Sequence, residues 1–212
     1  MLSLLLLSAA AAQIKPARPM PPLDWIGSME YPKEALRIGE RGTVALRVTV
    51  SPTGDVVRCE SQEKTPLNKA ACKHMMSGRK FLSAMDADGK PAYGIFKWRG
   101  RFAIQGTTNP PRIMPGIDMA LTLNAIPQGA PDPSYVIILY TMSAEGKVNA
   151  CVPQSTVKAQ SEDILAFLGK IACDELGKSP PPVVRDEKGR AVSSVHSAEI
   201  KFGTIAAMSA AH

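Results

Sequence analysis

The residues best suited to chemistry are four cysteines: Cys59, Cys72, Cys151 and Cys173. Cysteines form disulfides, act in redox reactions or bind metals. No two of them have the C-x-x-C spacing of a redox site. No histidine stands at ligand spacing from a cysteine pair. We therefore expect structural disulfides and neither a metal site nor a cofactor. Free thiols and metal ligation are the alternatives.

Other catalytic patterns give no candidate. The sequence has no Gly-x-Ser-x-Gly elbow, no His-Glu-x-x-His pair and no phosphate-binding loop. Asp86, Asp88 and Asp186 stand in turn-like stretches, where Asp is favoured because it bonds to its own backbone. We expect no catalytic residues, and a binding protein rather than an enzyme.

Length and composition indicate a globular protein of two domains. The chain has 212 residues, of which 45% are hydrophobic. Its formal charge is +6, which would suit an acidic partner or membrane surface. No basic run and no motif that interleaves aromatics with arginines is present, so nucleic acid is not an expected partner.

The N-terminus is typical of an exported protein. Leu4–Leu7 and the small residues Ala9–Ala12 predict a signal peptide at 1–12, with an uncleaved anchor as the alternative. The stretch is too short to span a bilayer, and no later stretch is apolar enough to do so. We therefore predict a chain without a membrane span.

Two halves of the sequence share a series of landmarks. The first half has an alternating stretch at 43–50, a glycine turn, and a return strand at 56–59. The second half repeats this at 135–142 and 148–151. The spacing from Gly54 to Cys59 equals that from Gly146 to Cys151.

The landmarks continue beyond the hairpins. A helical stretch with the second cysteine follows in each half, at 67–78 and 162–176, and then a last strand at 92–102 and 192–202. The spacing from Gly89 to Phe102 equals that from Gly189 to Phe202. A tandem duplication explains these matches, and it selects the pairs Cys59–Cys72 and Cys151–Cys173 among the three connectivities open to four cysteines.

The predicted fold class is α+β, with two small domains. Each has a three-stranded antiparallel sheet packed with one or two helices. The predicted segments are a signal peptide (1–12), a Pro-rich spacer (13–28), a first domain (29–105), a Pro-rich connector (106–133), a second, divergent domain (134–203) and a tail (204–212). The middle of the connector, 117–126, is apolar enough to be a strand or a docked segment.

The first half resembles a known family. The run from Tyr31 to Arg37, the following glycines, the run from Leu67 to Cys72, the Asp88-Gly89-Lys90-Pro91 turn and the strand ending at Phe102 resemble the C-terminal domain of TonB, the periplasmic energy transducer. The resemblance covers 31–102, and the second half shows it more weakly.

The resemblance implies a function in the Gram-negative periplasm. In that family an exposed strand pairs with an extended segment of an envelope protein, such as a TonB-dependent outer-membrane transporter. The residues it implies for peptide binding are Tyr31, Pro32, Lys97, Trp98, Arg99 and Arg101.

Each of these residues also has a structural interpretation. Tyr31-Pro32 would begin a helix, Trp98 would cover a core, and the cations would protect a sheet edge from aggregation. At the level of the whole chain, the alternatives are an assembly protein whose edges pair halves or form a homodimer, and a transducer whose anchor lies upstream of this start.

Overall fold

A computed structural model describes residues 13–21, 23, 29–77, 81–106, 116–154 and 161–209. The signal peptide expected at 1–12 lies outside these residues. The predicted α+β class is confirmed: antiparallel strand pairs combine with the helices α2 to α5. Within the described ranges, every helix is too short or too polar to cross a membrane.

The first half is built from a hairpin, a helix and a third strand. Its hairpin joins β2 (Gly42–Val50) to β3 (Val56–Ser61), and β6 (Pro91–Phe102) pairs antiparallel with the other edge of β2. The helix α3 (Pro66–Met76) begins where the Thr65 side chain accepts a hydrogen bond from the Asn68 amide, and proline occupies its first turn.

The hairpin turn of the first half requires glycine. Gly54 has φ +86°, and a Cβ there would lie 2.2 Å from the carbonyl oxygen of Phe81. The Phe81 amide donates to the Gly54 carbonyl across 2.9 Å. The turn is thereby fixed to the segment that follows α3.

The second half has the same order of elements. Its strands are β8 (Ser134–Met142), β9 (Val148–Gln154) and β12 (Ser194–Gly203), and its helix is α4 (Glu162–Lys178). Ser161 caps α4 through the Ile164 amide. β12 pairs antiparallel with β8, as β6 does with β2.

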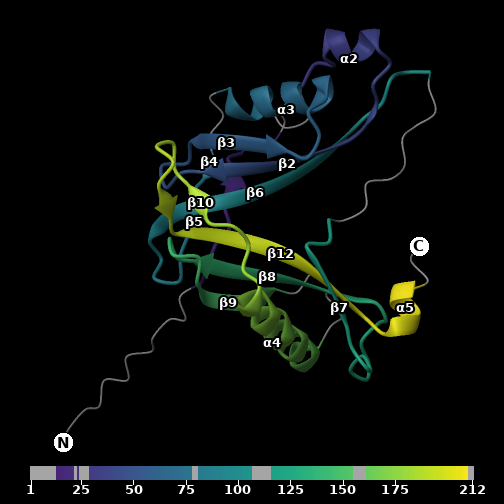
Figure 1. The fold of residues 1–212 in the computed structure, drawn as a ribbon, viewed down its shortest axis with the longest axis vertical. Helices are drawn as coiled ribbons and strands as arrows, with labels where there is room; N and C mark the ends of the chain where they lie inside the picture. Colours follow the sequence, from purple (N-terminus) through teal and green to yellow (C-terminus); the bar gives the residue numbers. More distant parts are fainter. Residues whose placement is uncertain are drawn as a thin grey trace, which may run out of the picture.

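The two halves form one sheet, because their third strands lie side by side. The strand order is β3-β2-β6-β12-β8-β9 (Figure 1). The β6–β12 contact is parallel and pairs Tyr93 with Ser194 and Gly94 with Val195. The predicted fold gave each half its own sheet, and pairing of the halves through their edges was expected only in the assembly alternative.

The register of that contact places the two helices on opposite faces of the sheet. Paired residues of parallel strands point to the same side. Tyr93 pairs with Ser194 and not with residue 193, its repeat equivalent, so the two strands are offset by one residue. Because side chains alternate along a strand, the repeat-equivalent residues 98 and 198 point to opposite sides of the sheet. Trp98 accordingly packs on the core under α3, and Ala198 lies in the core under α4.

A disulfide joins each helix to the return strand of its hairpin. Cys59 of β3 is bonded to Cys72 of α3, and Cys151 of β9 to Cys173 of α4. In the chain-entropy model, closing loops of this size stabilises a fold by about 3 kcal/mol each.

Short elements complete the structure. Part of the expected spacer is packed against the first half, since β1 (Arg18–Pro19) pairs with β4 (Phe81–Leu82) and Ile14 and Ala17 are buried. The expected tail contains α5 (Ile205–Ser209). The remaining elements are α2 (Lys33–Arg37), β5 (Ala84–Met85), β7 (Met119–Thr122), β10 (Val184–Arg185) and β11 (Ala191–Val192).

Candidate functional site: the outer edge of β6

Within the described residues, the outer edge of β6, which lies opposite β2, has a strand partner only near its start. There β12 pairs with residues 93 and 94. From Ile95 to Phe102, no strand in the described part of the chain pairs with this edge, while β2 covers the opposite edge throughout. A strand edge without a strand partner is a template for another extended segment.

A groove of about 600 Å3 opens where β6 and β12 separate. Charged side chains of both signs line it, so it does not attract a single class of ion. They are Arg47, Glu60, Lys97, Arg99, Asp118 and Glu199. No group of His, Cys, Asp or Glu side chains within the described ranges could hold a metal ion.

Lys97 crosses this groove. Its ammonium group donates to the Ser197 carbonyl of β12 across 2.9 Å and pairs with Asp118 across 2.6 Å. Both side chains of this ion pair are about one-third exposed. Lys97 was predicted as a partner contact, and the structure uses it to connect the two halves.

Asp118 bonds to both sides of the groove. One carboxylate oxygen accepts from Lys97, and the other accepts from the Glu199 amide across 2.8 Å. Burial raises the pKa of the Glu199 carboxyl, and the Asp118 charge raises it further, while Arg99 and Lys97 act in the opposite direction. The sequence analysis predicted a strand or docked segment at 117–126, which contains Asp118, but assigned no role to this carboxylate.

The other predicted site residues divide between the two faces of β6. The Arg99 guanidinium lies against Gly116 at the groove. Arg101 is exposed, opposite Thr43 in the ladder. The Trp98 ring lies on the α3 face, over Gly100 and edge-on to Phe102 with ring centroids 6.4 Å apart.

Tyr31 and Pro32 support the end of β6 from the α3 side. Pro32 is the residue before α2. The Tyr31 hydroxyl donates to the Glu40 carbonyl, and its ring is edge-on to Phe102 with centroids 5.9 Å apart. These contacts correspond to the structural interpretation of the pair, and they place Tyr31 beside the open edge.

A buried histidine lies on β12 near the point where the strands separate. His196 is 2% exposed, its Nε2 is 2.8 Å from the Ser194 hydroxyl, and its ring stacks on Tyr140 with centroids 4.9 Å apart. Burial, together with the Arg47 and Lys97 charges, lowers the pKa of His196 to about 3. Burial raises the pKa of Tyr140 to about 12.

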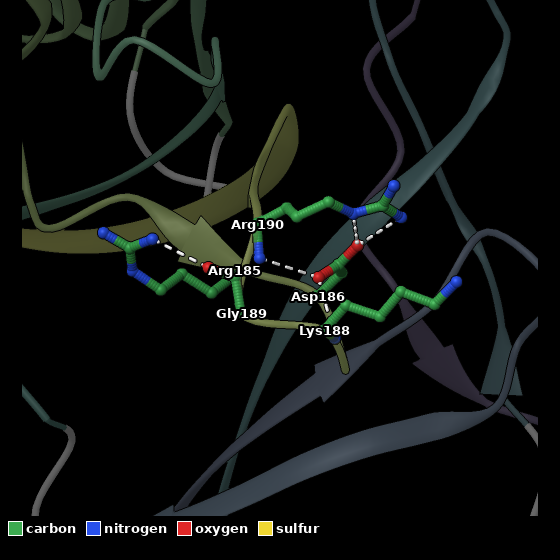
Figure 2. Close-up of polar contacts among 5 residues, drawn as sticks. All are labelled: Arg185, Asp186, Lys188, Gly189 and Arg190. Atoms are coloured by element: carbon green, nitrogen blue, oxygen red, sulfur yellow. Dashed lines mark hydrogen bonds and ion pairs between the residues drawn. The ribbon is translucent and has the colours of Figure 1, made fainter.

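The Asp186 turn joins β10 to β11. Figure 2 shows its carboxylate accepting from the amides of Lys188 and Arg190, and from the Arg190 side chain. Burial alone would raise the pKa of Asp186, but these hydrogen bonds lower it. The Asp86 carboxylate makes the same two backbone bonds, to Asp88 and Lys90, in the first half.

The hairpin, helix and third strand of the first half form a small α+β unit. Residues 28–104 match the family described as Gram-negative bacterial TonB protein C-terminal. This segment is similar to that family, whose domains mediate protein interactions in the Gram-negative periplasm. The resemblance predicted over 31–102 is confirmed.

The family match ends before the second half. The duplication therefore stays a prediction, although both halves have the same element order and equivalent disulfides. Comparisons with curated proteins and with solved structures gave no match.

Proposed function

We propose that this protein is a periplasmic binding module that adds an extended peptide segment of an envelope protein to the outer edge of β6. The partner class we favour is a TonB-dependent outer-membrane transporter. The observation that carries the proposal is the outer edge of β6 from Ile95 to Phe102, which no strand of the described residues covers and which lies in the segment that matches the TonB C-terminal family.

The chemistry of recognition is main-chain hydrogen bonding supplemented by side-chain contacts. In an antiparallel strand such as β6, alternate residues direct their N–H and C=O groups away from β2 and toward an incoming strand. The rings of Trp98 and Phe102 offer apolar contacts on one face, and Arg99 and Arg101 offer charge on the other. Lys97 must leave Ser197 before a strand can follow β6 along its full open length.

Two features support a periplasmic location. Both disulfides suit an oxidising compartment, and the family is periplasmic. Cleavage after Ala12 completes the proposal, and N-terminal sequencing of the mature protein tests it.

The second candidate is an assembly role. The β6–β12 contact favours this role because two strand edges of the same chain pair there. The outermost strands β3 and β9 would then join copies of the protein. Sedimentation separates the two functions: an assembly protein forms a dimer without peptide, and a peptide receptor does not. The third candidate, a force transducer, requires an apolar stretch of about 20 residues encoded in frame upstream.

Peptides from the N-terminal extended regions of TonB-dependent transporters test the first candidate, with backbone amide signals as the readout. Binding should shift the signals of residues 95–102. Methylating alternate peptide nitrogens on one edge of the bound strand should abolish binding, and methylating the other edge should not. Equal effects from both sets would overturn strand pairing, as would shifts confined to β3 or β9.

A further inference from the structure

The connector fills the outer edge of β12 with a strand. β7 runs parallel to β12 and pairs Met119 with Ile200 through to Thr122 with Gly203 (Figure 1). The ladder extends by one bond at each end, from the Asp118 amide to the Glu199 carbonyl at 2.9 Å and from the Leu123 amide to the Gly203 carbonyl at 3.0 Å. A segment outside the repeat thus augments the second half.

The side chains of this segment alternate in a regular pattern. Met119, Leu121 and Leu123 pack on the second core, while Ala120 and Thr122 are exposed. Asp118 precedes them and accepts the Glu199 amide and the Lys97 ammonium. The edge therefore takes an acidic residue followed by apolar residues at every second position.

The first half shows that the fold does not require this strand. By the repeat spacing, residues 100–103 correspond to the part of β12 that β7 covers. No strand within the described ranges lies on the outer edge of residues 100–102, yet Trp98 and Phe102 are packed on the first core. A strand at this position is an addition to a complete hairpin, helix and third strand.

We propose that the edge of β12 from Glu199 to Gly203 is a second strand-acceptor site, which the connector keeps closed. A partner segment that runs parallel to β12, with an acidic residue followed by alternating apolar residues, takes the place of β7 there. This site is separate from the β6 edge, and it does not depend on peptide binding at β6.

Covalent attachment explains why the site stays closed in the free protein. A tethered segment competes at an effective concentration of about millimolar. A free segment with equal contacts at micromolar concentration is therefore outcompeted about a thousandfold. Weakening the inward contacts of β7 should open the site without changing β12.

The test uses the full chain and a synthetic peptide with the sequence of residues 117–124. The opened variant carries Met119→Ser and Leu121→Ser, which remove two inward side chains. The matched control carries Ala120→Ser and Thr122→Ser on the exposed side of the same strand. We expect the peptide to shift the amide signals of residues 199–203 in the opened variant, with at least tenfold higher affinity than in the wild type or the control.

The proposal is overturned if the opened variant binds the peptide at 199–203 no better than the control. A peptide with serine at its three apolar positions should not bind. If the double variant does not fold, the wild type is titrated with millimolar peptide instead. The amide signals of residues 119–122 should then move to the chemical shifts of a chain that is not paired in a sheet. If these signals do not move, the exchange is refuted. Shifts at 95–102 would report the other edge and leave this result unaffected.

Discussion

The third strands of the two halves are equivalent in the repeat and differ in their surroundings. β12 has β8 along one edge and β6 and then β7 along the other, and its residues are buried or half-buried throughout. β6 has an outer edge that is open beyond Gly94 within the described ranges, and its second half alternates between exposed and half-buried residues. The same plan thus gives a closed strand in one half and an open one in the other.

If β6 accepts a partner as we propose, then the neighbour of the third strand, and not the hairpin or the helix, decides which half can do so. Both halves share the disulfide position and the Asp-anchored turn. Among the described residues of the connector, a strand is contributed only to the second half.

The largest expected difference concerns the equivalent residues Phe102 and Phe202. Phe202 is fully buried, whereas Phe102 is half-buried beside the open edge. Phe202→Ala should lower the free energy of unfolding by about 4 kcal/mol, and Phe102→Ala by about half as much. Urea denaturation of both variants checks this, and equal losses would show that β6 is covered in solution.

The disulfides should contribute equally, because both link a return strand to its helix. Removing either pair with Cys→Ser should cost about 3 kcal/mol of unfolding free energy. Since the halves share a sheet, we expect one cooperative transition in each variant, measured by calorimetry. Two separate transitions would mean that the β6–β12 contact does not couple the halves.

His196 should make stability depend on pH. An unfolded histidine has a pKa near 6.5, while the folded value is about 3. Between these values the unfolded chain binds a proton that the native state does not, so stability falls as the pH drops below 6.5, by about 2 kcal/mol at pH 5.

His196→Phe installs the residue type of the equivalent position, Phe96, and should remove this component. Urea denaturation at pH 7 and pH 5 measures the difference between variant and wild type. His74→Gln on α3 serves as the control and should retain the loss. The same pH dependence in His196→Phe would contradict a buried neutral ring.

The smallest expected change in the free energy of unfolding comes from substitution of Lys97, whose side chain crosses the groove. Lys97→Met should cost only about 0.5 kcal/mol, because the ion pair with Asp118 is partly exposed. It should nevertheless raise the affinity for an extended peptide severalfold, because the side chain no longer crosses the groove. Lys73→Met, an exposed lysine on α3 away from this edge, is the control, and titration calorimetry is the measurement. Weaker binding by Lys97→Met would mean that Lys97 contacts the partner instead.

Much of the local structure could be predicted from the sequence. Period-two alternation and turn glycines located the hairpins, so the predicted 43–50 and 135–142 differ by one residue from β2 and β8. The helices were also close, at 67–78 against Pro66–Met76 and at 162–176 against Glu162–Lys178. These features depend on residues that are close together in the sequence, so a single sequence is sufficient to predict them.

The contacts between the halves could not be predicted in this way. The parallel pairing of Tyr93 with Ser194 depends on how two folded units meet, and no local pattern encodes it. The role of Lys97 was missed for the same reason, since alternation places its side chain on a face but does not show that Asp118 and Ser197 lie opposite. The sequence also did not indicate that the His196 ring is stacked on Tyr140, because this contact depends on the pairing of β12 with β8.

Residue-resolved hydrogen exchange, without and with a transporter-derived peptide, tests most directly whether β6 is the open acceptor strand. In the free protein, alternate amides of residues 95–102 should exchange rapidly, while those of residues 199–203 are protected by β7. Peptide should slow exchange at 95–102 alone. Full protection of residues 95–102 in the free protein, or no gain with bound peptide, would contradict the account.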